Sequence, residues 1–179
     1  MLKLIIITLI FNFSSIFAQE NNTLNIEYSK PNYANPYIED DDDYDNVSNE
    51  YDKCPSTPNG VCVNEDGCTQ KVKRVLNFDS SSYKVSEKMA TQLQSIIEIA
   101  IECFGYKVAI IGHTDSTADE VYNKKLSKNR AMAIENIILS YDINPNRITT
   151  KWFGESKPAA SNITKDGRYK NRRVEIIFY

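Results

Sequence analysis

The chain has 179 residues, of which 41% are hydrophobic, enough for one core of about a hundred residues and too few for several large domains. Its net charge of −3 conceals two opposite halves: residues 1–70 carry 3 Lys or Arg against 12 Asp or Glu, and residues 71–179 carry 18 against 12. The basic half suits nucleic acid or an anionic cell-wall polymer. The sequence has no helix-turn-helix, aromatic RNP or zinc-finger pattern, so we expect no nucleic-acid partner.

The N-terminus is typical of an export signal. Residues 1–3 supply a positive charge, residues 4–13 an apolar run, and residues 14–18 a small-residue exit that ends at Ala18. The alternative is an uncleaved membrane anchor, but polar residues interrupt the run before the roughly 20 apolar residues that span a bilayer. We therefore expect residues 1–18 to be a signal peptide, with no transmembrane segment after its removal.

Residues 19–39 are rich in Asn, Tyr and Pro and have no sustained periodicity, which predicts a flexible tether. An acidic linker follows at residues 40–70. It contains closely spaced oxygen ligands of the kind that Ca²⁺ gathers in sets of six to eight: Asp41, Asp43, Asp45, Asn49 and Asp52. This stretch is similar to a thrombospondin type 3 calcium repeat, with Asn46 in place of that family's glycine. Two interpretations stay open, a calcium site or a solvated acidic linker.

Residues 71–179 alternate predicted strands and helices. We expect helices at 86–103 and 118–140, a loop region before the last strand, and strands at 72–78, 106–113, 147–154 and 171–179. Gly105 suits the position just past the first helix, and Thr117 with Glu120 resembles a capping box for the second. Asn144-Pro145-Asn146 stops the second helix. The pattern predicts an α+β sandwich with a mixed sheet.

A charged residue interrupts the apolar face of the second predicted helix. Arg130 shares that face with Leu126, Ala133, Ile134 and Ile137, so its guanidinium must find an anion in the core. Asp115 is the expected partner, because the strand before it ends at the edge of the sheet where ligand crevices form. An acid beside an arginine suits the ammonium and the carboxylate of an amino acid.

Five motifs in this half occur in the order of a known family. They are GHTD at 112–115, YNKKLSKNRA at 122–131, Arg147-Ile148, FGESKPAASN at 153–162 and GRYKNRRVEI at 167–176. Together they resemble the signatures of OmpA-like peptidoglycan-binding domains. The resemblance implies a βαβαβ(α)β two-layer sandwich, and the chain departs from the family at Ala118, where glycine is usual.

The resemblance also implies a function. Asp115 and Arg130 correspond to the residues that hold the diaminopimelate of the peptidoglycan stem peptide. Further matches at the ligand are Asn123, Thr114, Phe78 and Asp79, although Asn123 also suits a loop cap and Asp79 a turn. The implied protein is a periplasmic, non-catalytic module, with or without outer-membrane association, that tethers envelope components to the cell wall and needs no cofactor beyond the calcium of its linker.

Two other functions stay open. A cell-wall hydrolase requires an activated nucleophile, a metal-bound water or paired carboxylates, and the chain has no GxSxG motif and a single histidine, His113. We therefore expect no enzymatic activity. An accessory subunit of an envelope or motor complex would share the binding domain and add an envelope protein partner.

Four polar residues lie just before or at the start of the last predicted strand: Arg168, Asn171, Arg172 and Arg173. They either face an anionic polymer or support the fold, and the family pattern makes Asn171 and Arg172 at least partly structural.

Four cysteines agree with export to an oxidising compartment and allow three pairings. A CPxTPxGxxV…GC segment often precedes OmpA-like domains, and its match here implies a disulfide between Cys54 and Cys68. Cys62 and Cys103 are additional. Cys103 ends an apolar helical stripe, so we expect a small buried hydrophobic residue there. The spacings lack CxxC pairs, which disfavours zinc.

Overall fold

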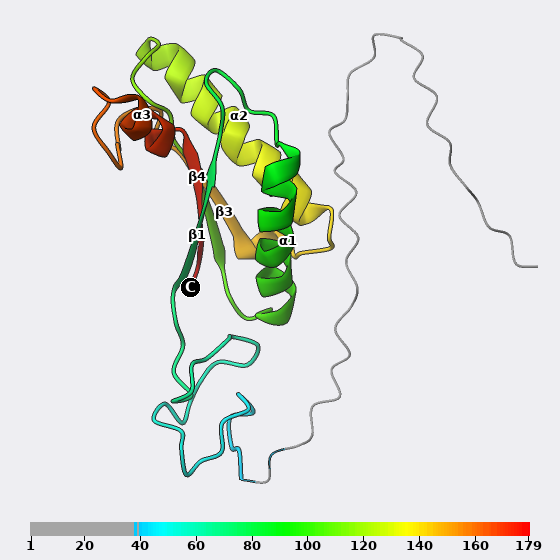
Figure 1. The fold of residues 1–179 in the computed structure, drawn as a ribbon. Coiled ribbons are helices and arrows are strands. Elements are labelled where there is room, and N and C mark those ends of the chain that lie inside the picture. Colours follow the sequence, from blue (N-terminus) through cyan, green and yellow to red (C-terminus); the bar gives the residue numbers. More distant parts are fainter. Residues whose placement is uncertain (1–37, 39) are drawn as a thin grey trace, which may run out of the picture.

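The computed structural model describes residues 38 and 40–179 (Figure 1). The predicted signal peptide and nearly all of the predicted tether lie outside these residues. Within the described part, no helix combines the length and the apolar character that crossing a membrane requires.

Helices and strands alternate along the basic half. In chain order they are β1 (Val72–Asn77), α1 (Glu87–Glu102), β2 (Val108–Gly112), α2 (Glu120–Leu139), the 3₁₀ turn η1 (Pro145–Arg147), β3 (Ile148–Trp152), α3 (Lys165–Asn171) and β4 (Arg173–Phe178). The strand order across the sheet is β1-β4-β2-β3. Strand β4 is antiparallel to both neighbours, whereas β2 and β3 are parallel. The expected α+β class with a mixed sheet is confirmed.

Helices α1 and α2 cover the same face of the sheet (Figure 1). Alternate residues of the strands point toward them, because successive side chains of a strand face opposite ways. The layer between sheet and helices includes Val108, Ile110, Val174, Ile176 and Phe178 from the strands and Leu93, Ile96, Ala131, Ile134 and Ile138 from the helices, all buried. Each fully buried large aliphatic side chain contributes about 1.5–3 kcal/mol, so this layer holds the domain together.

The end of β2 is pressed against α2. A Cβ atom at Gly112 would lie 2.0 Å from the carbonyl oxygen of Ser127, so only glycine permits this approach. The Ser127 hydroxyl accepts a hydrogen bond from the Gly154 N–H at 2.9 Å. Strand β2, helix α2 and the turn after β3 are thereby locked together where the GHTD motif begins.

The linker joins the domain at the opposite end of the sheet (Figure 1). The Gly105 N–H donates to the Gly60 carbonyl at 2.6 Å, and a Cβ at Gly105 would lie 2.5 Å from the Asn59 carbonyl. The buried Tyr106 hydroxyl lies 2.6 Å from the carbonyl oxygens of Cys62 and Gln70. Residues 59–70 are therefore packed onto the domain.

Two disulfides reinforce this end of the molecule. Cys54 pairs with Cys68, as the resemblance implies, and Cys62 pairs with Cys103. The expected burial of Cys103 is confirmed, and the disulfide gives it the partner that the sequence leaves open. Its helical stripe correctly indicates burial, but the partner against which it is buried comes from the linker.

Several local predictions also need correction. Asp119 caps α2, with its carboxylate accepting from the Tyr122 N–H at 2.9 Å, so the capping box at Thr117 does not form. Helix α2 runs from Glu120 to Leu139, two residues later at its start and one residue earlier at its end than the predicted span of 118–140. Gly105 lies beyond the C-cap of α1 and is required by the linker's approach. Helix α3 forms within the predicted loop region, capped by the Thr164 hydroxyl.

Candidate functional site

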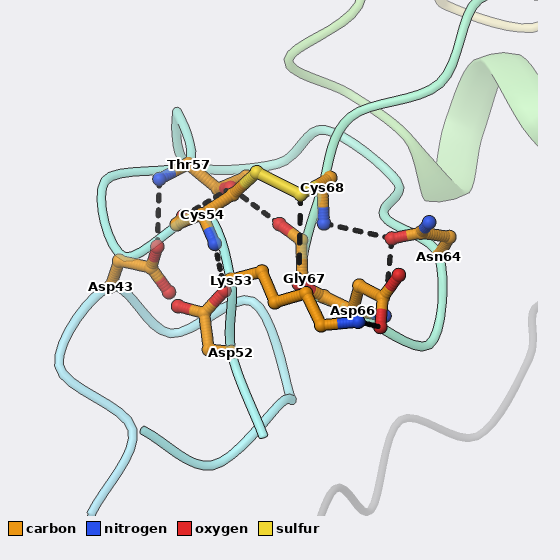
Figure 2. The surroundings of a disulfide bond; sticks show 9 residues. All are labelled: Asp43, Asp52, Lys53, Cys54, Thr57, Asn64, Asp66, Gly67 and Cys68. Carbon is orange, nitrogen blue, oxygen red and sulfur yellow. Dashed lines mark hydrogen bonds and ion pairs between the residues drawn. A yellow bond between two sulfur atoms is a disulfide. The ribbon is translucent and has the colours of Figure 1, made fainter. Parts of the chain in front are cut away.

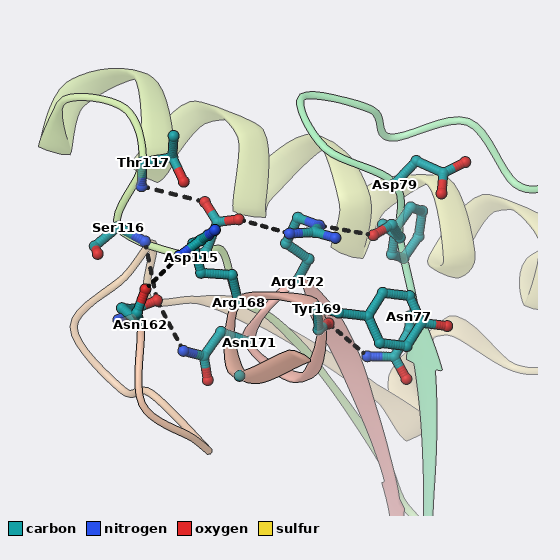
Figure 3. Close-up of polar contacts among 12 residues, drawn as sticks. Asn77, Asp79, Asp115, Ser116, Thr117, Asn162, Arg168, Tyr169, Asn171 and Arg172 are labelled. Carbon is teal, nitrogen blue, oxygen red and sulfur yellow. Dashed lines mark hydrogen bonds and ion pairs between the residues drawn. The ribbon is translucent and has the colours of Figure 1, made fainter. Parts of the chain in front are cut away.

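Asp115 follows β2 directly and lies at the carboxyl end of that strand. Its side chain is buried, with the residue 6% exposed. One carboxylate oxygen accepts the Thr117 N–H at 3.2 Å, and the other lies 2.8 Å from Nη1 of Arg172 (Figure 3). The strand therefore delivers Asp115 to the sheet edge that the sequence predicts, and its carboxylate is held from two sides.

The carboxylate of Asp115 stays ionised despite its burial. Burial by itself raises the pKa of this group, but the hydrogen bonds from Arg172 and from Thr117 outweigh it and leave the pKa below its usual value. Asp115 is thus an anion near the surface at every physiological pH. Such a group attracts a ligand ammonium.

Arg130 is fully buried, as its place in the apolar stripe predicts, but its partners differ from those expected. All three guanidinium nitrogens donate to backbone carbonyls, Nε to Ser82 at 2.8 Å, Nη1 to His113 at 2.9 Å and Nη2 to Asp79 at 2.9 Å. The expected hydrogen-bonded pair between Arg130 and Asp115 does not form, because Asp115 pairs with Arg172. The Asp115 carboxylate acts on Arg130 only electrostatically, without a hydrogen bond.

The three carbonyls around Arg130 come from two separate segments. Asp79 and Ser82 belong to the connection between β1 and α1, whereas His113 is the first residue after β2. The guanidinium also lies 5.3 Å from the ring centroid of Phe78. Burial lowers the pKa of Arg130 to about 10, and Asp115 opposes this shift, so the cation persists at neutral pH. Arg130 thus holds the Phe78-Asp79 connection against the GHTD motif.

Arg172 is the residue of this site whose contact with Asp115 the sequence does not predict. It lies just after α3, where its Nε donates to the Phe78 carbonyl at 3.1 Å, and its guanidinium lies 5.7 Å from the ring centroid of Tyr169. The sequence placed it among four residues that either face a polymer or support the fold. Asn171 and Arg173 of that group are buried, which corrects the polymer-facing interpretation for both. A basic residue two positions before Val174, the first hydrophobic core residue of β4, carries no pattern that would identify its partner.

Asn123 supports the loop that follows Asp115. Its side-chain amide donates to the Ala118 carbonyl at 2.9 Å and to the Glu155 carboxylate. Ala118 has no positive φ, so the loop turns without the glycine that is usual in the family. The structure therefore gives Asn123 a loop-supporting place, which is one of its two predicted roles.

A second amide network closes the other side of the site. The Asn162 side-chain oxygen accepts from the Ser116 N–H at 3.3 Å and from the Asn171 side chain at 2.9 Å (Figure 3). The Asn171 oxygen in turn accepts the N–H groups of Ala159 and Ala160. The loop before α3 is thus hydrogen-bonded to the residue that follows Asp115, a role of Asn162 that its sequence motif does not reveal.

Two buried polar atoms near Asp115 have no protein partner in the described structure. They are Nδ1 of His113 and the hydroxyl of Thr114. His113 stacks on Phe153 at 5.8 Å between ring centroids. Burial, followed by the nearby Arg173, lowers the pKa of His113 to about 4, so the ring is neutral at pH 7.

The predicted calcium ligands lie far from Asp115, in the linker. One carboxylate oxygen each of Asp41, Asp43 and Asp45 lies within 4.8 Å of the others. Asp52 accepts the Cys54 N–H at 2.7 Å, and Asp43 accepts the Thr57 N–H at 2.7 Å (Figure 2). Asn49 accepts the Asp42 N–H at 3.1 Å. The first three residues are therefore brought together, and Asp43 links this cluster to the disulfide loop through Thr57.

The sequence is similar to those of known envelope proteins. The chain is 36% identical over 141 residues to outer membrane porin F of Pseudomonas aeruginosa, covering 75% of this chain and 40% of the porin. It is 31% identical over 117 residues to the peptidoglycan-associated lipoprotein of Buchnera aphidicola, covering 64% of this chain and 68% of the lipoprotein. The chain thus spans less than half the length of the porin.

A solved structure agrees with the fold. The cell wall anchor of the T6SS from Pseudomonas aeruginosa superposes with a TM-score of 0.54 at 26% identity, covering 63% of this chain and 84% of that one. The OmpA family model matches residues 77–172, a span that begins at the end of β1 and ends at Arg172. With the mixed sheet and the residues around Asp115 inside that span, the chain belongs to the OmpA family.

Proposed function

We propose that this protein binds peptidoglycan through the diaminopimelate residue of the stem peptide and tethers envelope components to the cell wall. The observation that carries the proposal is the ionised Asp115 at the carboxyl end of β2, held beside two arginines. The names of two relatives, a peptidoglycan-associated lipoprotein and a cell wall anchor, support the same class of ligand. The periplasm, with or without outer-membrane attachment, is the corresponding location.

The charges suit the side chain of diaminopimelate. Its free ammonium would meet the Asp115 carboxylate, and its carboxylate would lie toward the cations of Arg172 and Arg130. Phe78 and Asp79 border the site because Arg130 holds their connection in place, and Thr114 offers an unpartnered hydroxyl. Lysine at the same position of a stem peptide has the ammonium but lacks this carboxylate, so the proposed site would discriminate between the two.

We propose further that binding is not followed by bond cleavage. The Asp115 carboxylate is paired with Arg172 and its pKa is lowered, so it stays ionised, the reverse of what a general acid requires. A depressed pKa suits an acid that binds a cation.

A sedimentation assay with purified sacculi tests both statements. The protein should pellet with diaminopimelate-type sacculi and release no soluble muropeptides over time. Asp115→Asn should abolish pelleting, because it keeps the shape and removes the anion. The matched control is Asp142→Asn, which changes an exposed acid whose positive φ asparagine accepts. Time-dependent release of fragments by the pure protein would replace binding with hydrolysis.

We propose calcium as a second ligand, bound by the linker. Unpartnered oxygens of Asp41, Asp43 and Asp45 converge on one point while their other oxygens accept backbone N–H groups. Burial, with repulsion from the neighbouring acids, raises the pKa of Asp45. Three converging carboxylate oxygens fit a hard cation. Asp52 and Asn49 would complete the set from the residues that the sequence predicts.

Calorimetry decides the calcium proposal. The protein should show saturable heat with Ca²⁺, and Asp45→Asn should remove it, since the amide can still accept the Val47 N–H but repels the cation. Asp42→Asn, at an exposed position in the same segment, serves as the control. Equal heats from both variants, or no saturable heat at millimolar Ca²⁺, would leave a solvated acidic linker.

A further inference from the structure

We propose that Arg172 is a positioning residue of the ligand site: it aims the Asp115 carboxylate and sets its charge for ligand capture. This inference rests on the proposed function and extends it to Arg172. The sequence allowed two roles for this residue, contact with an anionic polymer or support of the fold. The carrying observation is the contact at 2.8 Å between Nη1 of Arg172 and the Asp115 carboxylate.

Arg172 is fixed independently of Asp115. Its Nε donates to the Phe78 carbonyl at 3.1 Å, its guanidinium lies over Tyr169, and its own carbonyl accepts the Phe78 N–H at 2.8 Å. The Tyr169 carbonyl is in turn held by the Asn77 side chain at 3.0 Å (Figure 3). A guanidinium anchored to β1 and to α3 presents one nitrogen to Asp115 in a set direction. It therefore acts as a preorganised partner, with little conformational entropy left to lose.

The other charges near Asp115 do not replace this contact. From α2, Arg130 acts on Asp115 through space while its nitrogens are bonded to carbonyls. Asp79 and Tyr122 also act on Arg130. From β2, His113 is neutral at physiological pH. Arg172 is the cation among these groups that touches the carboxylate.

The Asp115 carboxylate keeps hydrogen-bonding capacity for a ligand while Arg172 is bound. A carboxylate has about four lone-pair directions. Arg172 and the Thr117 N–H use one direction on each oxygen, so the ligand ammonium can share the carboxylate with Arg172. Without Arg172, the buried acid would be easier to protonate and free to rotate, and either change weakens ammonium binding.

Titration of the Asp115 carboxyl by ¹³C NMR in the unliganded protein, combined with sacculus binding at neutral pH, tests the proposal. Arg172→Gln should move the Asp115 midpoint upward by at least about one pH unit and weaken binding at least about tenfold. Arg172→Lys keeps the charge but loses the Phe78 bond, so the midpoint should stay low while binding weakens severalfold. Arg74→Gln removes an exposed arginine of β1 and should change neither quantity.

A folded Arg172→Gln variant with an unchanged Asp115 midpoint, or with wild-type affinity, would overturn the proposal. If the glutamine variant does not fold, the lysine variant decides, because wild-type affinity there would contradict the aiming role. Failure of the proposed function gives a different pattern: the Asp115 midpoint moves as expected, but the wild-type protein does not bind sacculi.

Discussion

Two arginines at opposite ends of the sheet make the same set of hydrogen bonds in different settings. Arg130 donates to the carbonyls of Ser82, His113 and Asp79. Arg147 donates to those of Ala100, Cys103 and Tyr106. Arg147 lies at the linker end and is half-buried, whereas Arg130 lies beside Asp115 and is fully buried.

The difference shows what each arginine stabilises. Ala100 and Cys103 lie at the end of α1, where carbonyls lack helical partners, so Arg147 acts as a C-terminal cap. The carbonyls around Arg130 belong to loop residues, so Arg130 does not cap a helix. Burying a charge there is costly unless it is well paired, and the result is a connection held against the ligand site. One arginine completes a helix and the other assembles a site.

Replacing each arginine by alanine should show the largest difference between the two. Arg130→Ala leaves three carbonyls without their donor in a buried region and should cost about 3–5 kcal/mol of unfolding free energy. Arg147→Ala should cost about 1–2 kcal/mol, because water can reach those carbonyls. Chemical denaturation measures both values. Equal losses would mean that the burial of Arg130 has no special consequence.

Binding separates the two arginines further. Arg147→Ala should bind sacculi as the wild type does, since Arg147 precedes β3 at the amino ends of the parallel strands β2 and β3, whereas Asp115 follows the carboxyl end of β2. Arg130→Lys keeps the charge but cannot reach three carbonyls with a planar fork, so binding should weaken while most of the protein stays folded. Wild-type binding by a folded Arg130→Lys variant would contradict the site-assembling role.

Disulfides stabilise the linker end of the domain, whereas arginine hydrogen bonds stabilise the end that carries Asp115. The Cys62–Cys103 disulfide spans 41 residues, and replacing both cysteines by serine should lower the unfolding free energy by about 3–4 kcal/mol. Sacculus binding by the folded fraction should not change. Hydrogen exchange of residues 59–70 should rise in the same variant, because noncovalent contacts such as those of Gly105 and Tyr106 would then hold this segment on the domain. Unchanged exchange would show that the disulfide is dispensable for docking.

Acid should destabilise the ligand end through His113. The folded-state pKa of about 4 lies below the unfolded value of 6.5, so the unfolded chain binds more protons between these values. The contribution, at most about 3 kcal/mol, is present above pH 6.5 and is lost as the pH falls toward 4. His113→Phe should flatten this part of the stability curve. Asp115, whose pKa is lowered, loses its contribution only below its usual pKa, so the two effects occupy separate pH ranges. An unchanged slope in the Phe variant would assign the acid sensitivity elsewhere.

The fold was largely predictable from periodic patterns. Alternation and helical spacing located all the strands and both long helices of the described domain, and the stripe containing Arg130 correctly indicated its burial. Helix α3 was missed because a seven-residue helix containing Gly167 shows too few turns for a periodicity. Asp119 rather than Thr117 caps α2. Both residue types suit an N-cap, so the sequence did not distinguish between them.

The partners within the site were less predictable. Opposite charges suggested a bond between Arg130 and Asp115, but backbone carbonyls, which every residue carries, satisfy Arg130. Arg172 reaches Asp115 across 57 residues of sequence, and Cys103 reaches Cys62 across 41. Such contacts depend on the tertiary arrangement of distant segments, which local sequence patterns do not indicate.

Calorimetric titration with soluble muropeptides tests the central claim, that Asp115 captures the diaminopimelate ammonium. The wild-type protein should bind a diaminopimelate muropeptide saturably and its lysine counterpart at least about tenfold more weakly, because lysine lacks the second carboxylate. Asp115→Asn should lose the binding while Asp142→Asn retains it. Equal affinity for the two muropeptides, or wild-type affinity in a folded Asp115→Asn variant, would contradict this account of the site.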